Sequence, residues 1–298
     1  MTKVLLLGCG YLGYNLYEML KDSYDISIIG IPSPYTDRLD RFTVIDAFDR
    51  DAMASVDFRD AIVVDCIGLI ANNARSTDEE AVMQSLERKY LGLFESLKQG
   101  GARRLVYFSS GGTIYGPSPD PVPETAAINP LTLYSRSKAR VEDVLKGSGL
   151  DYLILRIANP FGGYQEPAKR QGVIPILIRK SFLQEPFEMW ADGESVRDYL
   201  YIRDFAEALK LLAQNDVSNE TVNVGSGVGR TLNYVIETVE QHTGKKIEVR
   251  RMKSDVPTVE SIVLDISKLV SLTGYSPRIS FEEGVRLETE RIREEIGL

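Results

Sequence analysis

Residues that build metal sites and hydrolytic triads are scarce in this sequence. It contains one histidine, His242, and two cysteines, Cys9 and Cys66. Both cysteines lie in apolar, strand-like segments without metal-ligand spacing, and His242 follows an amphipathic helical pattern with no nucleophile elbow to serve. The sequence therefore predicts neither a metal site nor a Ser-His-Asp hydrolase.

Positive charge and long apolar runs are also scarce. The 298 residues carry 35 Lys and Arg against 43 Asp and Glu, which gives a net charge of −8. Nucleic acid is not an expected partner, because its phosphates select basic surfaces. No stretch approaches ~20 apolar residues, and the chain starts with a strand-like run rather than a signal-peptide pattern. We expect no membrane association and a cytoplasmic location.

The sequence does contain a glycine-rich turn directly after its first apolar run. Residues 3–7 lead into Gly8-Cys9-Gly10-Tyr11-Leu12-Gly13, and apolar residues at helical spacing follow. Dinucleotide sites have this strand–turn–helix order, because glycines let the backbone approach the pyrophosphate at the N-terminus of the helix. The alternative is a plain strand–helix turn whose glycines serve packing. A position on the first strand favours the dinucleotide site.

Apolar runs and helical patterns then alternate along the first half of the chain. This alternation predicts an α/β fold with a doubly wound parallel sheet that is covered on both faces. Beyond the sixth strand the pattern loosens into helices separated by short strands, which predicts a smaller second lobe. The further strands are expected at 26–29, 43–45, 61–66, 104–108 and 152–156.

The end of the second strand leaves the choice of cofactor open. A site for NAD would place Asp or Glu there to bind the ribose hydroxyls, but the sequence reads Gly30-Ile31-Pro32. Arg38 and Arg41 follow and could meet the 2′-phosphate of NADP. Asp46, just past the third strand, could bind an adenine amino group or cap a helix. The expected cofactor is NAD or NADP, with NAD preferred.

A possible catalytic pair lies in Tyr134-Ser135-Arg136-Ser137-Lys138. Tyr134 and Lys138 are four residues apart, so on a helix both side chains share one face. Asn129-Pro130 is expected to open this helix. Tyrosine is a poor base at neutral pH, and a neighbouring ammonium favours its phenolate form. The pair could therefore exchange a proton with a sugar or alcohol hydroxyl.

Several motifs follow one another along the chain: GCGYLG at 8–13, SSGGTIYG at 109–116, YSRSK at 134–138, LRIANPFG at 155–162, GVIP at 172–175 and DGESVRDYLYIRD at 192–204. With these motifs in this order, the chain resembles the extended short-chain dehydrogenase/reductases, in particular the NAD(P)-dependent sugar epimerase/dehydratase group typified by UDP-galactose 4-epimerase. The resemblance implies a Rossmann-like domain at 1–158, to which a segment near 196–226 returns, and a mainly substrate-binding α/β lobe at 159–298.

The resemblance also implies roles for individual residues. Tyr134 and Lys138 would be the catalytic pair. Arg197 would hold a diphosphate, which a guanidinium can do with two parallel hydrogen bonds; the alternative is an exposed ion pair with Asp198. The implied cofactor-binding residues are Gly8, Gly10, Tyr11, Leu12, Gly13, Asp46, Ile67, Ser109, Tyr134 and Lys138. The implied substrate-binding residues are Asn159, Val173, Arg197 and Asp255.

At some positions the sequence departs from the family pattern. The Ser or Thr that assists the catalytic tyrosine falls on Gly111. Thr113, Ser110 or Ser109 then supplies the hydroxyl, unless the enzyme works without one. A second phosphate-binding arginine of the family falls at about Met252.

The same departures narrow the reaction. A 4,6-dehydratase would need an Asp-Glu pair where Gly112 and Thr113 stand, and a 3,5-epimerase-reductase would need a Cys and a His in the site. We expect an NAD(P)-dependent nucleotide-sugar 4-epimerase that acts through a transient 4-keto sugar. One alternative is an NAD(P)H-dependent nucleotide-4-keto-sugar reductase, and another is a non-catalytic dinucleotide-binding regulator. The expected partners are a nucleotide-diphosphate sugar and a second copy of the chain, paired through helices at 79–98 and 130–146.

Overall fold

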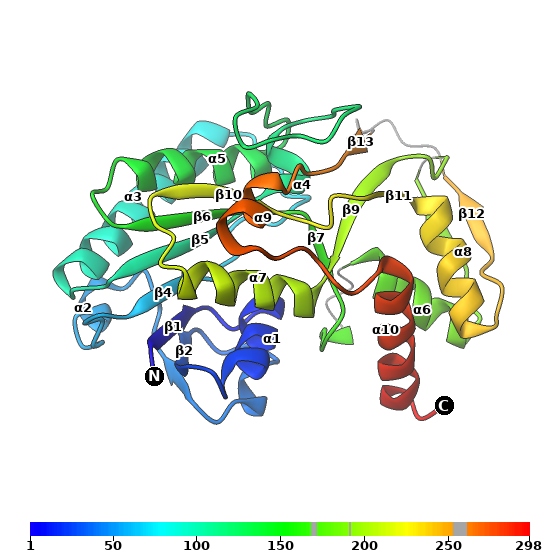
Figure 1. Ribbon diagram of the computed structural model, residues 1–298, viewed down its shortest axis with the longest axis horizontal. Coiled ribbons are helices and arrows are strands. Elements are labelled where there is room, and N and C mark those ends of the chain that lie inside the picture. The colour runs from blue at the N-terminus through cyan, green and yellow to red at the C-terminus, as the bar shows by residue number, and fades with distance from the viewer. Residues whose placement is uncertain (168–171, 191, 253–260) are drawn as a thin grey trace.

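The computed structural model describes residues 1–167, 172–190, 192–252 and 261–298. Its centre is a sheet in which every strand is parallel to its neighbours (Figure 1). The strand order is β10 (Glu220–Val224), β6 (Tyr152–Ile157), β5 (Arg104–Ser110), β4 (Ile62–Asp65), β1 (Lys3–Leu7), β2 (Asp25–Gly30) and β3 (Phe42–Val44). The chain winds outward from β1 to one edge and from β4 to the other. This Rossmann-like, doubly wound order confirms the predicted fold class.

Different helices cover the two faces of the sheet, because side chains alternate along each strand. In β1, Leu6 points to one face and Leu7 to the other. Both faces are apolar, so the strands read as continuous apolar runs in the sequence. Leu6 belongs to the core under α1 (Tyr11–Leu20) and α7 (Ile202–Gln214), and Leu7 to the core under α3 (Glu79–Gln99) and α5 (Leu133–Lys146) (Figure 1).

Helix α5 begins at Leu133 rather than at Asn129-Pro130, so the predicted start of this helix is wrong. The Thr132 hydroxyl accepts a hydrogen bond from the Ser135 N–H at 3.1 Å, and the Ser135 hydroxyl accepts one from the Thr132 N–H at 2.9 Å. This capping box satisfies two N–H groups that the first helical turn leaves without partners. The first turn, and with it the direction of Tyr134, is fixed by Thr132.

A second lobe has its own apolar core, at the right of Figure 1. The lobe contains strands β7 (Asn159–Phe161), β8 (Phe187–Met189), β9 (Val196–Tyr201), β11 (Gly229–Thr231), β12 (Val249–Arg251) and β13 (Ser261–Ile262). Its helices are α6 (Val173–Leu183), α8 (Leu232–Thr243) and α10 (Phe281–Glu295).

None of the helices in the described parts of the chain is long and apolar enough to cross a membrane.

A buried ion pair joins α5 to strand β6. Arg156 donates to both carboxylate oxygens of Glu142, from Nε at 3.0 Å and from Nη2 at 2.7 Å. Its Nη1 also donates to the Tyr115 hydroxyl at 3.0 Å, and that hydroxyl donates to Asn223 on β10 at 2.7 Å. The network holds the helix of Tyr134 against the sheet.

We expect Glu142→Gln to lower the free energy of unfolding by about 3–5 kcal/mol, because it leaves the buried Arg156 charge without its counter-ion. Urea-induced unfolding measures this difference. Glu87→Gln is the matched control. Glu87 on α3 pairs with Arg140 on α5 at 3.6 Å, and both side chains are partly exposed to solvent. Such surface pairs contribute about 0–1 kcal/mol. Equal losses in the two variants would contradict the importance of the buried pair.

Candidate active site

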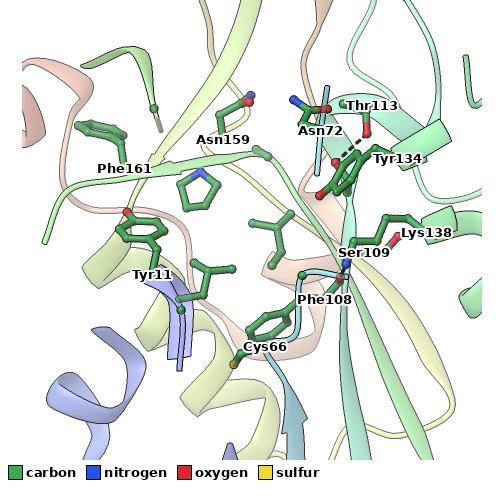
Figure 2. Close-up of a pocket in the computed structure, with 18 of the residues that line it drawn as sticks. Tyr11, Cys66, Asn72, Phe108, Ser109, Thr113, Tyr134, Lys138, Asn159 and Phe161 are labelled. Atoms are coloured by element: carbon green, nitrogen blue, oxygen red, sulfur yellow. Dashed lines mark hydrogen bonds between the residues drawn. The ribbon is translucent and has the colours of Figure 1, made fainter. Parts of the chain in front are cut away.

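A cavity of about 700 Å³ opens between the carboxyl edge of the sheet and the C-terminal lobe (Figure 2). It lies where the chain changes its winding direction, between β1 and β4, which is where open α/β sheets bind ligands. The predicted site residues that line it are Gly10, Tyr11, Leu12, Ile67, Ser109, Ser110, Thr113, Tyr134, Lys138, Asn159, Val173 and Arg197.

The glycine turn between β1 and α1 forms one wall of this cavity. Gly8 has a φ of +94°, in the left-handed region that favours glycine. A Cβ on Gly13 would lie 2.2 Å from the Gly8 carbonyl oxygen, so only glycine lets α1 pack this closely. Gly10 precedes the helix without a side-chain cap, which leaves the first N–H groups of α1 to an anion. Gly8 and Gly13 therefore shape the turn, while Gly10 lines the cavity.

Hydrogen bonds tie α1 to the segment that follows β7. The Tyr11 hydroxyl donates to the Gly162 carbonyl at 2.8 Å. The buried Asn15 side chain donates to the Tyr164 carbonyl at 2.8 Å and accepts from the Tyr164 N–H at 2.9 Å. These three bonds, which we call the α1 clasp, hold together two walls that are far apart in the sequence.

Tyr134 and Lys138 face the cavity from one side of α5 (Figure 2). Lys138 Nζ lies 5.9 Å from the centre of the Tyr134 ring. It donates to the Phe108 carbonyl at 2.8 Å, and an ammonium group has two further N–H donors to offer. An ammonium at this distance stabilises negative charge on a phenol oxygen.

Thr113 lies near the Tyr134 ring in Figure 2. Its Oγ1 donates to Ser110 Oγ at 2.9 Å, and both residues line the cavity, as Ser109 does. A Cβ on Gly111 would point elsewhere, to 2.6 Å from Leu264 Cδ1 and 2.9 Å from the Arg156 carbonyl oxygen. A serine at Gly111 would therefore not reach the cavity, and the hydroxyls that line it after β5 are those of Ser109, Ser110 and Thr113.

On the lobe side, the cavity is lined by an arginine that makes no ion pair within the described residues. Arg197 lies on β9, and burial lowers its pKa below the ordinary value. Asp198 is buried and accepts from the backbone N–H and hydroxyl of Ser226, so the alternative of an exposed Arg197–Asp198 ion pair is wrong. Asn159 and Val173 line the cavity too, and the Asn159 amide donates to the Asp198 carbonyl at 2.8 Å.

Comparison with known proteins agrees with this geometry. The model of the NAD dependent epimerase/dehydratase family matches residues 4–225. The chain belongs to this family. It is therefore an NAD-dependent enzyme of the extended short-chain dehydrogenase/reductase type, as the motifs implied.

Relatives and solved structures of the family cover most of the chain. A putative UDP-glucose 4-epimerase of Methanocaldococcus jannaschii is 31% identical over 293 residues, 94% of each protein. A dTDP-4-dehydro-6-deoxyglucose reductase of Escherichia coli is 32% identical over 214 residues, 70% of this chain and 68% of the relative. The structure of a Thermotoga maritima UDP-glucose 4-epimerase with UDP-glucose has a TM-score of 0.88 at 26% identity and covers 99% of both chains. A Thermus thermophilus UDP-glucose 4-epimerase in complex with NAD has a TM-score of 0.84 at 27% identity, over 98% of this chain and 99% of the other.

In this epimerase/dehydratase, the two arginines after β2 that could meet a 2′-phosphate, Arg38 and Arg41, make different contacts. Arg41 pairs with Asp25 at 2.7 Å, at the amino end of β2 and so at the opposite edge from the cavity. The suggestion that Arg41 meets a 2′-phosphate is therefore wrong. Arg38 lies over the ring of Tyr164, with its guanidinium 4.0 Å from the ring centre.

Asp46 is not among the residues that line the described cavity. The Asp46 carboxylate accepts from the Phe48 N–H at 3.0 Å, and the residue that caps α2 (Arg50–Met53) is Asp49. Asp46 is therefore not a helix cap, and its adenine-binding role stays a prediction. Asp255 lies outside the described residues.

Sequence reasoning missed several residues that line the cavity. Asp65 is the first polar residue after the apolar run of β4, and that position was a usable signal because carboxyl ends of parallel strands meet at the ligand crevice. Tyr199 stands two residues after Arg197 on β9 and so shares its face. Asn72 lies near Thr113 in Figure 2, in a segment without helix or strand, and nothing in the sequence marks it.

We expect Gly111→Ala to destabilise the protein by about 1–3 kcal/mol, because its Cβ would overlap Leu264 and the Arg156 carbonyl. Urea-induced unfolding measures this loss. Gly112→Ala is the matched control one residue along, where the nearest atom to the new Cβ is 3.4 Å away, an ordinary contact. A Gly111→Ala variant as stable as the control would show that the residue at position 111 faces the cavity after all.

Proposed function

We propose that the protein is an NAD-dependent 4-epimerase of a nucleotide-diphosphate sugar, acting through a transient 4-keto sugar. The observation that carries this proposal is that Tyr134 and Lys138 share one cavity with Arg197. The first two form a proton-exchange pair, and the third is a half-buried cation that makes no ion pair within the described residues. A sugar linked to a diphosphate matches both, with the sugar at the Tyr134–Lys138 pair and the diphosphate at Arg197.

The residues around the glycine turn fit a dinucleotide. The uncapped N-terminus of α1 and the close approach that Gly13 permits suit a pyrophosphate. A nicotinamide held there would supply the hydride chemistry at C4 of the sugar. NAD is preferred because the Thermus thermophilus relative of this fold is a complex with NAD.

The chain's own groups would move the proton of the C4 hydroxyl. The Tyr134 phenolate accepts this proton as the ketone forms and gives it back when the ketone is reduced. The Lys138 ammonium stabilises the negative charge on Tyr134 while the proton is absent. Ser110, whose hydroxyl accepts from Thr113, has its own proton to donate to the same sugar oxygen.

Arg197 and Asn159 would position the substrate. A guanidinium forms paired, charge-assisted hydrogen bonds with phosphate oxygens, and these are stronger in a partly desolvated site. Burial lowers the pKa of Arg197, so an anion at this place would also relieve a cost that the free protein bears. The diphosphate therefore has a prearranged partner on β9.

A second candidate is an NAD(P)H-dependent reductase of a nucleotide-4-keto sugar. Strand β2 ends in Gly30, followed by Ile31, which is 66% exposed, and no acid stands there to bind ribose hydroxyls. The Escherichia coli relative is named a reductase of a 4-keto sugar. Both reactions use the same tyrosine, so the cofactor separates them.

Tyr134→Phe should lower kcat at least ~100-fold, because the phenylalanine ring can neither accept nor donate the proton. The dissociation constant for NAD⁺ should stay close to that of the wild type, since the ring keeps its shape. Steady-state kinetics and a binding titration measure the two quantities. Turnover by the variant at the wild-type rate would remove Tyr134 from the role of base.

Denaturing the purified protein and identifying the released nicotinamide separates the two reactions. An epimerase returns the hydride within one turnover and has no need to exchange its cofactor, so we expect about one NAD⁺ or NADH per chain. A protein that emerges empty and binds NADPH on titration would contradict the epimerase and support the reductase.

A further inference from the structure

Asp65, the last residue of β4, has an unsatisfied carboxylate oxygen inside the cavity wall. The side chain is 2% exposed. Its Oδ1 accepts from the Ile67 N–H at 2.8 Å, and the Tyr90 side chain on α3 also interacts with the carboxylate, whereas Oδ2 has no hydrogen bond of normal geometry from any described residue. A buried charged oxygen without a partner is costly to the folded state, and native proteins seldom keep one without a use.

A second unsatisfied group lies on the same face of the sheet. Asp65 is the register partner of Tyr107 on β5, and Ser109 stands two residues further along, so the three side chains share one face. Ser109 is 4% exposed and lines the cavity, and no residue in the described parts of the chain bonds to its Oγ. Two orphaned oxygens on adjacent strand ends indicate a ligand that bonds to both.

Lys138 on α5 lies close to the same two strand ends. Its Nζ lies 4.9 Å from the centre of the Tyr107 ring and donates to the carbonyl of Phe108, the residue before Ser109 (Figure 2). Two of its N–H donors remain for a ligand. One place at the sheet edge therefore offers a carboxylate acceptor, a hydroxyl and an ammonium donor.

The charged and titratable groups that face Asp65 come from several elements. Burial raises the pKa of Asp65, and Lys138 on α5, the Ile67 N–H and Tyr90 on α3 act against that rise. Cys66, directly after β4, has its own pKa raised, chiefly by burial. A ligand that donates a hydrogen bond to Asp65 would further favour its ionised form.

The chemistry of this place selects a vicinal diol. One hydroxyl can donate to Asp65 while its oxygen accepts from Lys138, and the adjacent hydroxyl can pair with Ser109. Ribose and the substrate's hexose both contain such a pair. The register places Asp65 beside Leu7, directly before the glycine turn, whereas Asn159 and Arg197 come from β7 and β9. The position therefore favours the ribose.

We propose that Asp65 binds the cofactor, accepting a hydrogen bond from a hydroxyl of the ribose attached to nicotinamide, with Ser109 and Lys138 completing the diol site. This inference rests on the proposed use of a nicotinamide cofactor. It adds a carboxylate ligand to the side chains that the motifs implied. The unpaired oxygen is then a cost of the cofactor-free protein that binding removes.

Asp65→Asn keeps the shape of the side chain but removes its charge and one acceptor oxygen. In cofactor-free protein, we expect the dissociation constant for NAD⁺ to rise about 10-fold or more, because hydrogen bonds to charged groups are among the strong ones. The constant for ADP, which ends before the second ribose, should not change. The midpoint of thermal unfolding without cofactor should stay level or rise, since a neutral amide is cheaper to bury. Calorimetric titration and a thermal melt measure these quantities.

Asp143→Asn is the control, because Asp143 is an exposed carboxylate on α5. Unchanged affinity of Asp65→Asn for NAD⁺ would overturn the proposal. Weaker binding of UDP-glucose alone would also overturn it, because the diol would then belong to the sugar. A lower melting point with equal losses of affinity for NAD⁺ and ADP would overturn it too, because Asp65 would then be structural. A wild-type protein that binds no NAD⁺ would overturn the proposed function as well, whereas a change confined to Asp65→Asn tests this inference alone.

Discussion

The parallel pairing of β1, β4 and β5 constrains where this protein can bind ligands. Within the sheet, backbone N–H and C=O groups bond to those of neighbouring strands, and helices cover both faces. Polar side chains are therefore tolerated only where strands end. Parallel strands bring those ends to one edge. The glycine turn, Asp65 and the serines at 109 and 110 meet there although they are far apart in the sequence.

Sequence patterns were sufficient for the first six strands of the sheet, because strands buried on both faces must be apolar throughout, whereas β10 lies beyond the point where the pattern loosens. They failed where a local contact determines where a helix starts or at which edge of the sheet a side chain lies. Residues 129 and 130 contain a proline suited to a helix start, yet the reciprocal bonds of Thr132 and Ser135 place the first turn later. Arg41 follows the second strand in sequence, but it precedes β3 and so lies at the wrong edge.

The predicted pair Tyr134 and Lys138, and the other predicted residues that line the cavity, followed from motifs, whereas side-chain direction did not. A letter-by-letter match places a hydroxyl at Gly111, but the backbone there turns its Cβ toward Leu264. Asp65 lies within an expected strand, and only the structure shows that its Oδ2 lacks a hydrogen bond from the described residues. Such features depend on three-dimensional neighbours that no spacing along the chain records.

The site contains a buried carboxylate, Asp65, and a half-buried guanidinium, Arg197, neither of which makes a salt bridge within the described residues. Burial lowers the pKa of Arg197 and raises that of Asp65, so each charge costs free energy in the protein without a ligand. Glu142 and Arg156, by contrast, neutralise each other behind the same helix. The protein thus pairs its charges where they hold the scaffold and leaves them open where a ligand can complete them, which is the basis of a preorganised site.

The α1 clasp has a consequence for the rate at which ligands exchange. Tyr11 and Asn15 fasten the first helix to the segment after β7, across the N-terminus at which a pyrophosphate would rest. If a molecule held between these walls has to wait for the three bonds to open, its residence time would depend on a protein motion as well as on its own contacts. Slow exchange of this kind suits a catalyst that regenerates its cofactor in every cycle, and it would limit one that must replace the cofactor after each turnover.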